Sequence, residues 1–200
     1  GEDVIHVVPT SLNLPAEFSE AQFPVRVEQT GLASDSGGPG KRRGGLGYFK
    51  EIRVLCDCEI FSQGDRSVIA PWGANGGRAG GLFGIFINPG TPAERAVPPL
   101  SNGTKILEGD LVRVVTTGGG GWGNPFQREL PYVRRDVIWG KVTFDGAMRH
   151  YGVVFLDEKN FKVDVGGSKA LRQMMRKRRS KPPFFDRGSQ FPKLKSSGAL

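Results

Sequence analysis

Residues 50–60 read KEIRVLCDCEI and alternate between apolar and charged side chains at nearly every position. Charged residues such as Glu51 and Arg53 fall on one face of an extended chain, and an apolar set falls on the other. The apolar set is Ile52, Val54, Cys56, Cys58 and Ile60. A period of two is typical of a half-buried antiparallel strand. The pattern predicts one strand across 50–60 and a fold built on an antiparallel sheet.

Outward from this strand, five more segments have the composition of extended chain. They are residues 4–8, 23–29, 81–87, 111–117 and 152–156. The Glu-Gly-Asp sequence at 108–110 is a turn signal that leads into one of them.

Helical patterns come only late in the chain. Residues 127–139 place Leu130, Val133, Val137 and Ile138 near one face of a helix. Pro131 fits such a helix only in its first turn, because proline lacks the backbone N–H that later turns need.

Two further helices are predicted from their N-caps. Thr143 can cap FDGAMRHY, and Ser168 can cap residues 169–179, whose basic end suits the negative end of the helix dipole. After Ser180 the sequence is rich in Pro, Ser and Lys, which predicts an extended arm that is ordered only when it wraps a partner.

Composition excludes a helix bundle. Glycine (30 residues) and proline (14) make up 22% of the 200 residues, against roughly 12% in average proteins. The expected fold class is α+β and mostly β: an antiparallel sheet or sandwich with long glycine-rich loops, short C-terminal helices and an extended basic arm.

The charge of +8 is concentrated at the end of the chain. Residues 166–200 hold ten Lys or Arg and one acid, so the preceding residues are close to neutral. We expect three parts: a β-rich body at 1–165, a helix at 166–179 and a basic tail at 180–200. A basic tail suits an acidic protein surface or nucleic acid, and nucleic acid is the less favoured partner because few aromatic residues interleave with the cations.

Compartment is indicated only by what the sequence lacks. No run of 18 apolar residues predicts a membrane span, and residues 1–10 show no basic segment followed by a long apolar one. Two cysteines, Cys56 and Cys58, are too few to form a disulfide framework for a domain of this size. The default expectation is a cytoplasmic protein without membrane contact.

Motifs for metal binding or nucleophilic catalysis are weak. His6 and His150 lie far apart, and Cys-x-Cys is not the usual zinc spacing. We expect the two cysteines to pack in the core. No G-x-S-x-G motif occurs, so catalytic residues stay unassigned and no metal ligands are predicted.

Three glycine-rich stretches, 37–47, 71–81 and 116–125, dominate the candidate functional residues. Glycine lets a backbone approach a ligand closely, and successive N–H groups can bind an anion, which nearby guanidinium groups would reinforce. The substrate- or phosphate-binding candidates are Gly38, Gly40, Arg42, Arg43, Gly44, Gly45, Trp72, Arg78, Gly119, Gly120, Gly121 and Trp122.

Neither a P-loop nor a dinucleotide fingerprint occurs in these stretches. Two interpretations therefore stay open. The loops either pack tightly against a neighbouring chain or domain, or they contact phosphate or substrate.

The ordered set of motifs resembles the hydantoinase B/oxoprolinase family over about residues 13–179. The matching segments are Asn13–Glu17, Phe23–Glu28, Asp35–Gly47, Pro71–Gly73, Gly118–Pro125, Asp136-Val137 with Gly140, Val142 and Ala147, and Tyr151–Val154. The chain departs from the family's tendencies at Thr117 (usually Pro), Trp122 (usually Tyr) and Asn124 (usually Asp).

The resemblance is to the C-terminal portion of a longer B-type subunit, which implies a proteolytic or genetic boundary at Gly1. It also implies partners: the N-terminal portion of the B-type subunit, carrying a divalent metal, and a hydantoinase A-like subunit, carrying ATP and Mg²⁺. No cofactor is expected on this chain alone, and the expected state is a hetero-oligomer that acts on a small-molecule substrate.

In this family the A-type subunit phosphorylates a carbonyl oxygen, and the B-type subunit completes the reaction on the activated intermediate. The resemblance thus implies part of an ATP-dependent cyclic-amide hydrolase, inactive as a single chain. One alternative is the same part of an ATP-dependent ketone carboxylase. Another is a non-catalytic lobe that assembles the complex.

Overall fold

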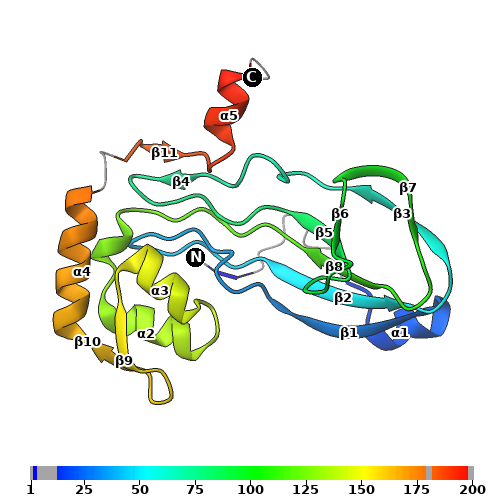
Figure 1. Cartoon of the computed structure of the whole chain (residues 1–200), viewed down its shortest axis with the longest axis horizontal. Coiled ribbons are helices and arrows are strands. Elements are labelled where there is room, and N and C mark those ends of the chain that lie inside the picture. Colours follow the sequence, from blue (N-terminus) through cyan, green and yellow to red (C-terminus); the bar gives the residue numbers. More distant parts are fainter. Residues whose placement is uncertain (1, 4–12, 179–181, 198–200) are drawn as a thin grey trace.

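The computed structural model describes residues 2–3, 13–178 and 182–197, so the strand predicted at 4–8 lies outside the described residues. Its largest unit is a five-stranded antiparallel sheet in the order β1-β2-β8-β5-β6 (Figure 1). The strands are β1 (Val25–Leu32), β2 (Tyr48–Val54), β5 (Gly84–Ile87), β6 (Arg95–Val97) and β8 (Leu111–Val115). The strands predicted at 23–29, 81–87 and 111–117 are confirmed with shifted bounds.

The single strand predicted at 50–60 is wrong. The chain leaves the large sheet after β2 and starts β3 (Cys58–Gln63), which pairs with β7 (Leu100–Ile106) in a separate two-stranded sheet. The two strands that pair with β2 do not extend beyond this point, because β1 begins opposite Val54 and β8 begins opposite Arg53. Leu55 N still donates to Pro24 O at 2.9 Å, but neither neighbouring strand extends past this point to continue the ladder.

This break also overturns the prediction that the cysteines pack in the core. Cys56 is half-buried in the bend and Cys58 is exposed at the start of β3. Partial burial, together with the neighbouring Cys56 and Asp57, raises the pKa of the Cys58 thiol.

The core of the sheet is aliphatic. Alternate residues of the strands pack together, as a period of two requires. The buried members of this core are Val54, Ile85, Ile87, Val97 and Val112 of the sheet, together with Ile106 of β7.

The opposite end of the molecule is helical (Figure 1). It holds a 3-10 turn, η1 (Pro125–Gln127), helices α2 (Leu130–Ile138), α3 (Phe144–Tyr151) and α4 (Val165–Arg178), and the hairpin β9 (Val154–Asp157) with β10 (Lys162–Asp164). A second core lies here, made of Val133, Val137, Val142, Ala147, Tyr151 and Val153. Pro131 lies in the first turn of α2, and the Thr143 hydroxyl accepts a hydrogen bond from Gly146 N at 2.9 Å, so both predictions are confirmed.

Ser168 does not cap α4. The helix begins at Val165, and the Asp164 carboxylate accepts the hydrogen bond of Gly167 N at 2.9 Å. Ser168 is fully buried instead, and its hydroxyl accepts from Val154 N at 2.9 Å. It ties the helix to β9.

Residues near both ends form three short elements that the sequence did not predict. They are α1 (Ala16–Gln22), β11 (Phe185–Asp186) and α5 (Phe191–Ser196). Strand β11 pairs with β4 (Gly73–Ala74), and the Arg187 guanidinium stacks over the Trp72 ring at 4.9 Å. Residues 182–188 thus contact the body of the same chain. The predicted fold class, α+β with antiparallel sheets and mostly β, is confirmed.

Candidate functional site

The three glycine-rich stretches lie side by side between the sheet and the helical end. Arg42 and Trp122 exchange both backbone hydrogen bonds, at 3.0 and 2.9 Å, and Gly121 N donates to Arg78 O at 2.9 Å. The stretch 116–125 therefore bonds to both of the others. Long loops are held here by backbone pairing, as strands are.

Glycine is required by this pairing. A Cβ atom at Gly38 would overlap the Arg78 carbonyl oxygen, one at Gly44 would overlap Gly119, and one at Gly120 would overlap the Trp72 carbonyl. The stretches pack against one another within the chain, whereas the packing interpretation had placed them against a neighbouring chain or domain.

A cavity of about 990 Å³ opens beside this layer of glycines. Seven of the twelve predicted binding residues line it: Arg42, Arg43, Gly44, Gly45, Gly119, Gly120 and Trp122. Such a volume is in the range of small-molecule sites. The structure brings residues of all three glycine-rich stretches to this cavity, with Pro71 from the stretch 71–81.

The sequence-based candidates did not include the wall of the cavity that the sheet forms. Tyr48, Lys50 and Ile52 of β2 line it, together with Val114 of β8. The three β2 residues are spaced by two, so the alternation that predicted the strand would have placed them on one face. Lys50 adds a half-buried cation to the exposed Arg42.

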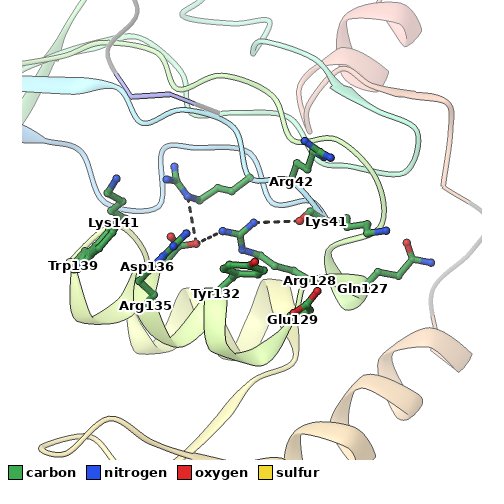
Figure 2. A pocket seen from close by; sticks show the side chains of 11 residues that line it. Lys41, Arg42, Gln127, Arg128, Glu129, Tyr132, Arg135, Asp136, Trp139 and Lys141 are labelled. Atoms are coloured by element: carbon green, nitrogen blue, oxygen red, sulfur yellow. Dashed lines mark hydrogen bonds and ion pairs between the residues drawn. The ribbon is translucent and has the colours of Figure 1, made fainter.

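Arg43 is part of a buried ion-pair cluster. Its side chain is 6% exposed, and its guanidinium donates to Gly44 O at 2.5 Å and faces Asp3 at 3.3 Å and Asp136 at 3.6 Å. Asp136 also accepts from Arg128 at 2.7 Å, as drawn in Figure 2. The Arg43 guanidinium is therefore engaged in ion pairs within the chain that stabilise the fold.

Asp3 belongs to the same cluster. Burial works against its ionisation, but hydrogen bonds from Lys141 and from Leu46 N, with the charge of Arg43, hold the pKa of Asp3 below its ordinary value. The cluster joins residues 2–3 to the first glycine stretch.

The remaining predicted residues lie outside the cavity. Gly38, Gly40 and Gly121 are buried in the backbone layer, Trp72 packs at 5.7 Å from Phe185, and Arg78 is half-buried near His150. Burial, and then the charge of Arg78, lowers the pKa of His150.

Within residues 2–3, 13–178 and 182–197, no group of three or more His, Cys, Asp and Glu side chains is arranged to hold a metal ion. In the same residues no helix is long and apolar enough to cross a membrane.

The family model for hydantoinase B/oxoprolinase matches residues 1–125, well over half of the chain. The chain belongs to the hydantoinase B/oxoprolinase family. An uncharacterised protein of Methanocaldococcus jannaschii is 35% identical over 163 residues, which are 80% of this chain and 28% of that protein.

Two enzymes are also similar. The caprolactamase subunit beta of Pseudomonas jessenii is 32% identical over 160 residues, 78% of this chain and 27% of that subunit. The crystal structure of that ATP-dependent caprolactamase matches with a TM-score of 0.67 at 29% identity, over 80% of this chain and 28% of that one. A nucleotide-free acetone carboxylase structure shares the fold, with a TM-score of 0.70 at 24% identity over 84% and 27% of the two chains. The chain spans between a quarter and a third of the length of these relatives.

The structure explains several family motifs of this chain. Asp136 is the shared carboxylate of the cluster, and Gly140 ends α2 with φ of +67°. Among the departures, Thr117 and Trp122 line the cavity, and the Asn124 carboxamide accepts from Phe126 N at 3.0 Å to cap η1. Asp at that position would cap equally well.

Proposed function

We propose that this chain is part of an ATP-dependent cyclic-amide hydrolase of the hydantoinase/oxoprolinase type. In this proposal the glycine-lined cavity helps form the site where a phosphorylated substrate intermediate is hydrolysed. The observation that carries it is the convergence of glycine backbone, Arg42 and Lys50 on one cavity of about 990 Å³. Membership of a family that includes an ATP-dependent caprolactamase supports the reaction class.

The chemistry asks for a pocket that holds a dianion. Transfer of a phosphoryl group from ATP, on an A-type subunit, turns the carbonyl oxygen of the cyclic amide into a good leaving group. The intermediate must then be oriented and kept from bulk water while water attacks its carbon.

The residues of this chain suit that holding role. Arg42 and Lys50 offer cations that reach a phosphate, and a guanidinium can donate to two of its oxygens. Gly119 and Gly120 line the cavity with backbone atoms alone, which a ligand can approach closely. Ile52 and Val114 supply an apolar wall against which the rest of the ring can lie.

The test uses the complex purified with all its subunits. Arg42→Ala and Lys50→Ala are each expected to lower kcat/KM for ATP-dependent ring opening by about 10- to 100-fold, the range of a lost charge-assisted hydrogen bond. Arg149→Ala is the matched control, because Arg149 is 69% exposed in a surface pair with Asp145. Equal activity of all three variants would refute the assignment of the site.

Arg43→Ala is not a clean test, because removing a buried guanidinium would leave Asp3 and Asp136 without their partner. Arg78→Ala tests the remaining predicted cation. We expect no more than a twofold change, because Arg78 does not line the cavity.

The ketone-carboxylase alternative makes a different prediction in the same assay. ATP turnover would depend on bicarbonate, and a ketone would replace the cyclic amide. The assembly alternative predicts that deletion of residues 180–200 breaks the complex. An intact, active complex after that deletion would remove the assembly role of the tail.

A further inference from the structure

A second concave site lies against α2. It has a volume of about 510 Å³ and is walled by cations and aromatic rings (Figure 2). Its exposed walls are Lys41 and Arg42 of the first glycine stretch, Tyr132 and Arg135 of α2, and Trp139 at the C-terminal cap of α2, with Arg128 behind them. Only Arg42 and Arg43 line both this cavity and the glycine-lined one.

Positive charge exceeds negative charge in this second cavity. Six cations line it, against the carboxylates of Glu129 and Asp136. Counting Asp3, which pairs with Lys141 and Arg43 at its edge, six cations still face three carboxylates. In the part of the chain that the structure describes, no carboxylate lies within ion-pair distance of Arg135 or Lys41.

Two of the cations, Arg135 and Arg128, are held in place before any ligand arrives. The Arg135 guanidinium lies 5.1 Å from the Tyr132 ring centroid and 5.0 Å from that of Trp139. Arg128 is fixed by Asp136 at 2.7 Å and by the Lys41 carbonyl at 3.2 Å. Side chains ordered in this way lose little conformational entropy when they bind a ligand.

We propose that this cavity is a binding site for a small phosphate-bearing anion, separate from the glycine-lined cavity. The positive surplus favours an anion, and the planar guanidinium of Arg135 matches the geometry of phosphate oxygens. A volume of about 510 Å³ fits a small molecule. The site goes beyond the proposed function, because it needs neither ring opening nor ATP turnover.

The experiment is residue-resolved footprinting of the native complex with an arginine-selective reagent, with and without inorganic pyrophosphate. Arg135 is the reporter, because it lines only the second cavity. Saturating pyrophosphate is expected to lower the modification rate of Arg135 about tenfold and to leave Arg149 unchanged. Added salt should reduce the protection, since the attraction is electrostatic.

A second arm uses substitution. Lys41→Gln is expected to raise the pyrophosphate concentration needed to protect Arg135 by about tenfold, and Arg149→Gln is expected not to change it. Both substituted side chains are exposed, so the fold should be retained.

Four results would overturn the proposal. Protection of Arg42 without protection of Arg135 would place the anion in the glycine-lined cavity. Equal protection of Arg149 would show unspecific attraction. An Arg135 that stays unreactive without pyrophosphate would mean that a partner's acidic segment fills the site. An Arg135 that reacts equally with and without pyrophosphate would show that no anion binds. Ring-opening activity enters none of these readouts, so they are independent of the proposed function.

Discussion

Nη2 of Arg128 donates a hydrogen bond to Oδ2 of Asp136 at 2.7 Å, and the same oxygen faces Nε of Arg43 at 3.6 Å. The Asp136 side chain is only 4% exposed. One buried carboxylate therefore partners two guanidinium groups and joins α2 to the first glycine stretch. The geometry of both cavities depends on this contact, because Arg43 lines each of them.

Asp136→Asn is expected to lower the free energy of unfolding by about 3–5 kcal/mol, because Arg128 would lose its partner charge and the buried Arg43 would lose one of its two. Asp145→Asn is the matched control. It breaks an exposed pair with Arg149 and is expected to cost less than about 1 kcal/mol. Urea unfolding of the two variants measures the difference, and similar losses would contradict the role given to Asp136.

Gly120→Ala is expected to disrupt the packing of the glycine-rich stretches, because a methyl group there would overlap the Trp72 carbonyl oxygen and backbone cannot move aside cheaply. We expect a loss of more than about 3 kcal/mol or failure to fold. Gly166→Ala is the matched control. It lies in α4, where the nearest atom to the new Cβ is 3.6 Å away.

At position 166 alanine is expected to be neutral or to stabilise the chain by up to about 1 kcal/mol, because it favours a helix over glycine. Thermal unfolding of both variants gives the comparison. A Gly120→Ala variant as stable as Gly166→Ala would mean that the backbone layer is not closely packed.

Local patterns predicted elements well where one physical signal determines them. The Thr143 cap and the first-turn position of Pro131 follow from short-range hydrogen bonding and sterics, and both are confirmed. The break at residue 55 could not be predicted in this way, because it depends on where β1 and β8 begin. Strand ends set by distant partners leave no local signal.

The same distinction applies to the site. The glycine-rich stretches were recognisable from composition, and seven of the predicted residues do line one cavity. Lys50 was missed because its side chain faces the cavity only once β2 takes its place in the sheet. Arg43 resembled a ligand cation in the sequence, but its pairing with Asp136 joins residues far apart in the chain.

Tyr151→Phe is expected to stabilise the chain by about 1 kcal/mol. Burial raises the pKa of the Tyr151 phenol far above its ordinary value, and its hydroxyl has no hydrogen-bond partner among the described residues. Removing an unsatisfied buried polar group removes its desolvation penalty. Tyr132→Phe, at an exposed position, should change stability little. If Tyr151→Phe instead destabilised the chain by about 1 kcal/mol or more, the loss would correspond to one hydrogen bond. That result would show that the Tyr151 hydroxyl has a partner in solution.

His150 is expected to make the fold less stable as the pH falls below about 6.5. Burial first, and then the charge of Arg78, lowers the pKa of His150, although Asp35 and Asp145 act in the opposite direction. The unfolded chain, with an ordinary histidine pKa near 6.5, then binds a proton more readily than the folded chain. The free energy of unfolding should therefore fall as the pH is lowered from about 6.5 to the folded-state pKa of His150, and it should level off below that pKa.

Urea unfolding at several pH values between about 7.5 and 5.5 tests this. This range lies above the ordinary pKa values of carboxyl groups, so their titration contributes little. His150→Gln is expected to flatten the pH dependence, because glutamine is of similar size and does not titrate. Lys105→Gln, which removes an exposed charge that is not among the groups acting on His150, should keep the slope of the unsubstituted chain. An equal slope in His150→Gln would mean that another group binds the proton and that the surroundings of His150 do not disfavour its charged form.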